Sequence, residues 1–166
     1  MAAGDTYQAG PGTLVFGATG TEIDVSCQVN SLTIAATKDQ GDSTTKLCGT
    51  TKSPAAVYTY AMSGNIDHDL TDPDGLWALS QVAPDTEVPF VFVPSTEAGT
   101  EAAGTIIIDP MDFGYAEYGE IMASDIEWTL TGPPVYTLGG IPLVRRDTDA
   151  DAYDNATGDD EMARAS

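Results

Sequence analysis

Residues 124–131 read Ser-Asp-Ile-Glu-Trp-Thr-Leu-Thr, in which polar and apolar side chains alternate from Asp125 onward. Successive side chains of a β-strand point to opposite faces, so this period of two predicts a strand that buries Trp128 and its apolar neighbours two residues away on either side. The opposite side of the strand carries Asp125 and Glu127. The stretch therefore predicts a sheet with one face packed in a core and the other face solvent-exposed and acidic.

Similar patterns recur upstream. Residues 22–29 and 31–37 alternate cleanly, and residues 57–66 place two tyrosines and a methionine on one side. We expect three further strands here, each burying one face. Residues 87–94 and 104–109 contain the runs Phe-Val-Phe-Val and Ile-Ile-Ile, which predict strands buried on both faces.

One helix interrupts this pattern. Asp72 is expected to cap its N-terminus, with a proline in the first turn, and apolar residues recur at helical spacing over 76–82 before Pro84 ends the run. The chain is therefore predicted to be mainly β with one short α-helix.

Segments outside these elements complete the predicted organisation. Residues 1–12 are small and polar and are expected to form an N-terminal arm, followed by a β domain over 13–138 and an acidic C-terminal tail over 139–166. The connection 38–53 is too long for a tight hairpin turn and holds three of the six basic residues. We expect it to be an ordered binding loop rather than a disordered one, with Leu47 and Cys48 as an apolar contact.

The charge is strongly one-sided. The 166 residues carry 26 acids against 6 bases, for a net charge of -20, and fourteen carboxylates but no lysine or arginine lie between Ser53 and Val144. Such a surface repels polyanions, which excludes an electrostatic clamp on nucleic acid. No apolar run reaches membrane-spanning length, so we expect a soluble protein made in the cytosol, with no membrane partner.

The sequence offers little for catalysis or cofactors. His68 is the one histidine and has no nucleophile motif nearby, so a polar surface role is expected for it. Cys27 and Cys48 are expected to be buried reduced thiols rather than a disulfide, and they lack the spacing of a zinc site. Residues 147–155 space aspartates as in a calcium loop but lack its glycine and its glutamate, so we expect no metal site, no cofactor and no enzymatic activity.

Several segments together carry a resemblance to a known family. They are Gln28-Val29-Asn30-Ser31-Leu32-Thr33-Ile34, Lys46-Leu47-Cys48-Gly49, Tyr60-Ala61-Met62-Ser63-Gly64, Val88-Pro89-Phe90-Val91-Phe92-Val93-Pro94 and Ser124-Asp125-Ile126-Glu127-Trp128-Thr129-Leu130-Thr131-Gly132. Over about residues 13–136 the chain resembles the major tail proteins, or tail tube proteins, of long-tailed phages that infect actinobacteria. The resemblance implies two packed antiparallel sheets, sandwich-like or barrel-like, flanked by one helix. It also implies hexameric rings stacked into a tube, as part of a virion tail.

This resemblance gives the candidate residues their expected roles. If Glu22, Asp24, Ser26 and Gln28 line the channel, DNA meets charge of its own sign and slides without binding. The loop 38–53 becomes the contact between rings, through Lys38, Lys46, Leu47 and Lys52. Edge-to-edge closure in a ring would satisfy the open sheet edges that endanger a monomer. The family also implies a tape measure protein and tail terminator and tip proteins as partners.

Three other classes of protein remain open at this level. A capsid decoration protein is also a small acidic β domain. A secreted calcium-dependent carbohydrate-binding β-sandwich would use the acidic loops as ligands, but the N-terminus lacks the features of a signal peptide. A glycosidase could use paired carboxylates such as Asp125 and Glu127, although an i, i+2 pair among so many acids is weak support.

Overall fold

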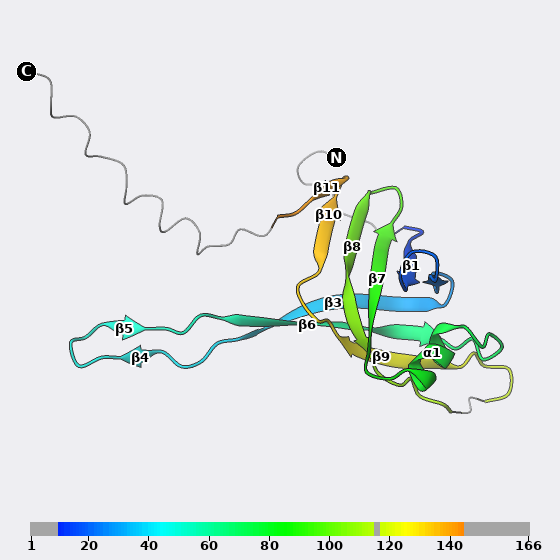
Figure 1. The fold of residues 1–166 in the computed structure, drawn as a ribbon, viewed down its shortest axis with the longest axis horizontal. Helices are drawn as coiled ribbons and strands as arrows, with labels where there is room; N and C mark the ends of the chain where they lie inside the picture. Colours follow the sequence, from blue (N-terminus) through cyan, green and yellow to red (C-terminus); the bar gives the residue numbers. More distant parts are fainter. Residues whose placement is uncertain (1–9, 115–116, 145–166) are drawn as a thin grey trace, which may run out of the picture.

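The computed structural model describes residues 10–114 and 117–144 (Figure 1). Residues 1–9 and 145–166, which make up most of the expected N-terminal arm and acidic tail, lie outside the described residues. The elements in chain order are β1 (Thr13–Phe16), β2 (Ile23–Asp24), β3 (Val29–Asp39), β4 (Thr44–Thr45), β5 (Thr51–Lys52), β6 (Val57–Asp67), α1 (Leu76–Val82), β7 (Thr86–Ser95), β8 (Thr100–Ile108), β9 (Ala123–Thr129), β10 (Val135–Leu138) and β11 (Ile141–Pro142).

Two antiparallel sheets form the body. The larger has six strands in the order β11-β10-β8-β7-β1-β2, and the smaller has three in the order β3-β6-β9. Their strands cross one another where the sheets face each other (Figure 1), as in orthogonal sheet packing. A bridge between Ile106 and Leu130 joins the two sheets at one end of β9. The prediction of a mainly β fold with two packed sheets and one short helix is confirmed.

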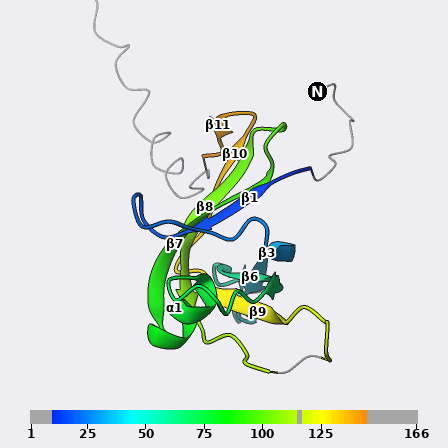
Figure 2. The same ribbon diagram turned by 90° about the vertical axis from the view of Figure 1, so that its right-hand side faces the viewer.

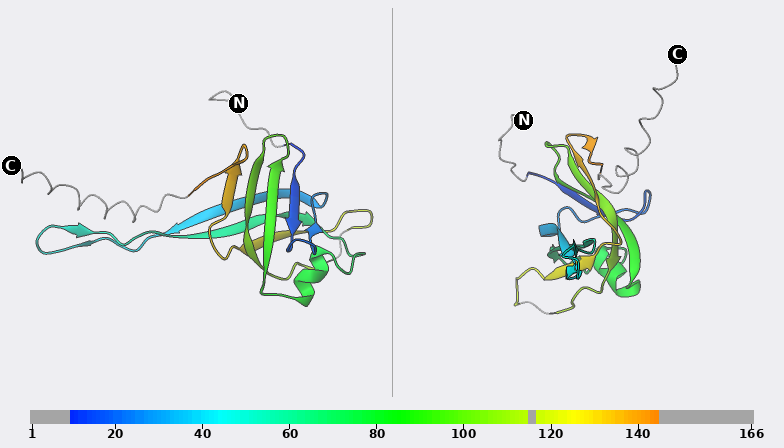
Figure 3. Two further views of the ribbon diagram at one scale, coloured as in Figure 1. Left: turned by 45° about the horizontal axis from the view of Figure 1, so that its top comes forward. Right: turned by 90° about the vertical axis from the view of Figure 1, so that its left-hand side faces the viewer.

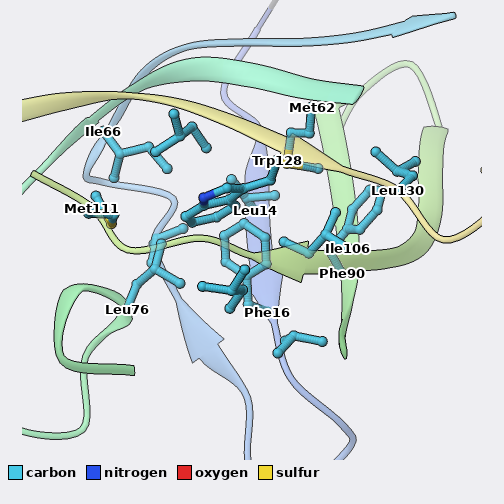
Figure 4. Close-up of a cluster of buried hydrophobic side chains, with 14 residues drawn as sticks. Leu14, Phe16, Met62, Ile66, Leu76, Phe90, Ile106, Met111, Trp128 and Leu130 are labelled. Atoms are coloured by element: carbon cyan, nitrogen blue, oxygen red, sulfur yellow. The ribbon is translucent and has the colours of Figure 1, made fainter. Parts of the chain in front are cut away.

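The core lies between the two sheets (Figure 4). Trp128 from β9 meets Phe16 from β1 edge to face, with ring centroids 5.8 Å apart, and its indole Nε1 donates a hydrogen bond to the Asp109 carbonyl over 3.1 Å. Met62 and Phe90 are buried beside them. The alternation of residues 124–131 is confirmed, because every apolar side chain of that stretch is buried and both of its carboxylates are exposed.

The expectation that β7 and β8 are buried on both faces is wrong. Val88, Phe90 and Ile106 face the core, but Val91 is 39% exposed and Ile107 is only half-buried. The reason is architectural: within the described residues, no second layer covers the outer face of the six-stranded sheet (Figure 2). An apolar run here reflects strand propensity as well as burial.

The predicted strand over 22–29 is also wrong. Only β2 is extended, and the chain then turns at Ser26–Gln28, where the Gln28 amide donates to the Val25 carbonyl over 2.8 Å. The Asp24 carboxylate accepts from the Ser26 amide over 2.9 Å and also bonds the Ser26 hydroxyl. Such local side-chain bonds to the backbone compete with a strand ladder, and the predicted strand is interrupted between β2 and β3.

The helix forms where apolar spacing indicates it, but its cap differs from the prediction. Gly75 occupies the N-cap position, and the Asp72 carboxylate instead accepts a hydrogen bond from the Asp74 amide over 3.0 Å, within the preceding turn. The helix is fastened to the segment after β8. Gln81 Nε2 donates to the Met111 carbonyl over 2.6 Å, and the Met111 amide donates to the Ser80 hydroxyl over 3.2 Å.

Cys27 and Cys48 are both free and exposed, so the expectation of buried thiols is wrong. Cys27 lies in the turn that interrupts the predicted strand, and Cys48 lies at the tip of the hairpin between β4 and β5. The hydroxyl of Thr50 is 2.7 Å from Cys48 Sγ and lowers the pKa of that thiol. Both positions are therefore open to thiol reagents.

Candidate assembly surfaces

The long loop of the sequence is a β-hairpin arm. β3 and β6 pair up to Asp39 and Val57, and the two chains then continue together through β4 and β5. Gln40 Nε2 donates to the Pro54 carbonyl over 3.1 Å, which ties the chains between the two ladders. We call residues 40–56 the arm. It extends far beyond the body of the protein (Figure 3), so most of its surface is offered to other molecules.

Of the four residues predicted to make ring contacts, Lys46, Leu47 and Lys52 lie in the arm. A turn over 46–50 closes it, with the Lys46 amide bonded to the Thr50 carbonyl over 2.8 Å. Leu47 projects from the turn and is fully exposed, and Lys52 lies on β5. Lys38 lies nearer the body, where it pairs across the ladder with Tyr58. The lysines are thus distributed along the hairpin, and an apolar side chain lies at its end.

The four residues predicted to line a channel do not share one strand face. Asp24 belongs to β2, at one edge of the six-stranded sheet, and Glu22 precedes that strand. Ser26 and Gln28 lie in the following turn, where Ser26 Oγ accepts a hydrogen bond from the Leu14 amide over 2.9 Å. Hydrogen bonds from the side chain and amide of Ser26 lower the pKa of Asp24. The alternation on which that prediction depended is therefore absent.

A more uniform polar surface lies on the three-stranded sheet. The face turned away from the core is continuous across β3, β6 and β9, because the register places Thr33 beside Ser63 and Ser63 beside Glu127. Ala35, Ala61 and Thr129 form the next row. We call this surface the polar face. Over these three strands it presents hydroxyl, methyl, amide and carboxylate groups, with no cation and no aromatic ring.

Side-chain hydrogen bonds order one end of the polar face. Asn30 Nδ2 donates to Asn65 Oδ1 over 2.9 Å and to Asp67 Oδ1 over 2.6 Å. Asn65 Nδ2 then donates to Asp125 Oδ1 over 2.8 Å. The amides thus occupy oxygens of Asp67 on β6 and Asp125 on β9, and the network links all three strands. A network of this kind holds negative charge in place without a cation.

Both edges of the three-stranded sheet are long. β3, with eleven residues, forms one edge, and β9, with seven, forms the other. The six-stranded sheet ends instead in β2 and β11, which have two residues each. Unpaired backbone groups along a long edge are ready to accept another strand. The smaller sheet is therefore the one suited to edge-to-edge growth.

His68 lies directly after β6 and is half-buried, so its predicted surface role is wrong. Its backbone amide donates to the Met122 carbonyl over 2.8 Å, and its Nε2 lies 2.5 Å from the Ser124 hydroxyl. The Ser124 hydroxyl also lies 3.5 Å from the Asp112 carbonyl. Nδ1 is buried without a protein partner. His68 thus joins the end of β6 to the segment before β9, and Ser124 is too buried to act as an exposed nucleophile.

This environment predicts a loss of stability in acid. Burial lowers the pKa of His68 below its ordinary value of 6.5, and the nearby Asp112 and Asp67 oppose that effect only in part. Because the unfolded chain takes up the proton first, the contribution of neutral His68 is complete above pH about 6.5 and declines below it. In urea unfolding at about pH 5 and 7.5, the stability difference between wild type and His68→Asn should therefore shrink at the lower pH. A difference that grows in acid would contradict this. Ser124→Ala should retain the pH dependence.

Two further kinds of feature, a metal site and a membrane-spanning helix, are not found among the described residues. Among them, no group of three or more histidine, cysteine, aspartate or glutamate side chains is placed to hold a metal ion. The aspartates of 147–155, weighed above as a calcium loop, lie outside the described residues. Within the described part of the chain, no helix is both long and apolar enough to cross a membrane.

The polar face could not be assembled from sequence alone, although its parts were visible. For the predicted strands 31–37, 57–66 and 124–131, the side turned away from the core was in each case predicted correctly. What joins them is the register, for example Asn65 beside Asp125, and register between strands far apart in the chain has no local signature.

Comparisons with known proteins found similarity in structure alone. No family model matches the chain, and no curated protein matches it in sequence. A chain in the tail of an empty gene transfer agent particle, determined with C6 symmetry, superimposes with a TM-score of 0.55 and 15% identity, over 80% of this chain and 99% of that one. A chain of the native gene transfer agent virion gives 0.50 and 16%, over 75% of this chain and 95% of that one. The chain therefore has the mainly β fold, with antiparallel sheets and one short helix, of a tail particle protein.

Proposed function

We propose that this protein is a structural subunit of a phage-type tail, and that it forms the tail tube by closing into hexameric rings that stack. The observation that carries the proposal is the three-stranded sheet, which combines a uniform polar face with two long open edges. Likeness to a chain from a tail with C6 symmetry supports the same assembly. The role is structural and not enzymatic.

The polar face forms the wall of the channel. Pairing of β3 in one subunit with β9 in the next would continue the sheet around a ring and remove both edges. Asp67, Asp125 and Glu127 would then face the lumen, among hydroxyl and methyl groups. This replaces the channel assignment of Glu22, Asp24, Ser26 and Gln28, of which only Asp24 belongs to a strand, β2 at an edge of the other sheet.

Such a wall suits the passage of DNA. Affinity for a duplex comes mainly from cations that neutralise phosphates and release counterions, and the polar face has none. Its carboxylates repel phosphates over about 8–10 Å at ordinary salt. The genome would therefore slide through without adhering.

The arm joins successive rings. Lys46 and Lys52 are cations on a projecting hairpin, and the body that they would meet in the next ring carries fourteen carboxylates and no lysine or arginine between Ser53 and Val144. Leu47 would add an apolar contact at the tip. A tape measure protein inside the tube and terminator and tip proteins at its ends are the further partners that this role implies.

Electron microscopy combined with thiol labelling tests the proposal. Concentrated protein should form hollow filaments. In a Cys27→Ser/Cys48→Ser background, Ser63→Cys on the polar face should react with a polymer-bearing maleimide in monomers but be protected in filaments, because the polymer cannot enter the channel. Val91→Cys, on the outer face of the six-stranded sheet, is the matched control and should react in both states. Absence of filaments would sink the tube, and equal labelling of Ser63→Cys in both states would sink the channel assignment.

A further inference from the structure

An exposed pair of aromatic rings lies where α1 meets the segment after β8. Phe113 is 74% exposed, and its ring centroid is 5.5 Å from that of Trp77 in the first turn of the helix. The indole Nε1 of Trp77 donates to the Asp112 carbonyl over 3.2 Å, which holds the backbone next to Phe113 against the helix. We call Trp77 and Phe113 the aromatic platform. Aromatic rings that are fixed in place offer a large apolar contact area, and such residues often dominate the energy of an interface.

Acidic residues flank the aromatic platform in the chain. Asp112 directly precedes Phe113 and is exposed. The connection from β6 to α1 begins at His68, whose ring centroid lies 6.5 Å from that of Trp77. This connection has no lysine or arginine and carries three more carboxylates, those of Asp69, Asp72 and Asp74. A partner that combines an apolar side chain with cations would therefore complement this surface.

The tip of the arm in the same chain has this combination. Leu47 is fully exposed, the exposed Lys46 directly precedes it, and Lys52 lies on β5. The Lys46 amide donates to the Thr50 carbonyl and the Gly49 amide donates to the Lys46 carbonyl, each over 2.8 Å. The leucine and the lysine are therefore presented together by an ordered turn.

The arm tip and the aromatic platform lie at opposite ends of the molecule. Figures 1 and 3 both place β4 and β5 at one end and α1 at the other, so the two cannot meet within one copy. A stack of identical rings is a head-to-tail arrangement, in which the arm of one copy meets the opposite end of the next. The segment 117–122, with the exposed Tyr118 and Ile121, lies on the other side of β9 from α1 (Figure 2) and is a separate surface.

From these observations we infer that Leu47 of one copy docks on the aromatic platform of a copy in the adjacent ring, with Lys46 beside the aspartates that flank the platform. The inference rests on the proposed function, because it names the place where the arm binds the next ring. The apolar contact covers side chains that are otherwise exposed to water and supplies most of the affinity. The charge attraction is weakened by solvent, but it favours this acidic end of the molecule over other surfaces.

Alanine substitutions on the two sides test this contact. Leu47→Ala and Phe113→Ala should each raise the protein concentration needed for tubes by at least about tenfold, with no change in ring formation. Because the two side chains contact each other, the double variant should be no more than about threefold worse than either single variant, whereas independent losses would multiply to about a hundredfold. Tyr118→Ala is the matched control: it removes an exposed aromatic ring on the other side of β9 and should form tubes as wild type does.

A cross-link locates the contact directly. Cys48 follows Leu47 and is exposed, and Gly114 follows Phe113 at a position where an added Cβ would meet nothing within 4 Å. In a Cys27→Ser background, a short bismaleimide should join Gly114→Cys to Cys48 of another copy in tubes but not in rings. Tyr118→Cys in the same background is the control and should give no such product.

Sedimentation and electron microscopy measure tubes, native mass spectrometry measures rings, and circular dichroism verifies the fold of each variant. Three results would each overturn the inference and leave the proposed function intact: tubes of Phe113→Ala at the wild-type concentration, a double variant with about a hundredfold defect, or equal cross-linking of Gly114→Cys and Tyr118→Cys. A Gly114→Cys cross-link that forms equally in rings would also overturn it, because the contact would then lie within a ring. If wild type itself forms no tubes, the proposed function fails, and this contact fails with it.

Discussion

Trp128→Ala should cost about 3–5 kcal/mol of unfolding free energy, the usual range for removing a large aromatic side chain from a core. Trp128 is 2% exposed, packs against Phe16 from the opposite sheet and bonds the Asp109 carbonyl. Its removal leaves a cavity between the sheets and removes the hydrogen bond to the Asp109 carbonyl. Because domains of this kind are stable by only about 5–15 kcal/mol, the loss is a large part of the total. Urea unfolding of the monomer, followed by far-ultraviolet circular dichroism, measures it.

Two further variants control this result. Trp128→Phe keeps an aromatic ring in the core but loses the hydrogen bond, and should cost about 1–2 kcal/mol. Trp77→Ala removes the other tryptophan, whose ring packs on Phe113 at 5.5 Å and whose Nε1 bonds the Asp112 carbonyl over 3.2 Å. Trp77 fastens the helix to a loop and does not join the sheets, so its loss should cost less than that of Trp128. Equal costs would show that the core is not centred on β9.

Replacing Lys38, Lys46 and Lys52 with glutamate should abolish tubes while leaving the subunit folded and able to form rings. The three lysines change from +1 to -1 each, so the net charge moves from -20 to -26. The arm would then repel the acidic body of the next ring, and the attraction proposed between rings would be lost. All three lysines are exposed, so the substitutions should change the unfolding free energy by no more than about 0.5 kcal/mol. Electron microscopy of the assembled material measures the outcome.

The charge-preserving triple variant with arginine at the same positions is the matched control, and it should form tubes. Rings serve as an internal control, because general repulsion from the added charge would reduce rings and tubes together. Full-length tubes from the glutamate variant would refute a role of these lysines in stacking. Loss of rings and tubes alike would show that the arm acts within the ring.

Local chemistry explains which features of the sequence were read correctly. Period-two alternation gave the buried side of β9, β3 and β6, and apolar spacing with Pro84 gave α1. The long polar connection marked the arm, although its hairpin ladders were not foreseen. The same rules failed where short-range hydrogen bonds compete with a ladder, as at Asp24 and Ser26, and at the Asp72 turn.

By itself, then, the sequence determined the kind of element at most positions, the sign of the charge and the place of the arm, because these depend on neighbours within a few residues. Only the tertiary structure decided which strands lie side by side, and so brought Asn30, Asn65 and Asp125 onto one face. It alone revealed that Trp77 and Phe113 pack on each other. The physical reason is that strand pairing and ring packing are set by contacts between residues distant in the chain, whereas the period of a strand shows which side chains share a face and not what lies against them.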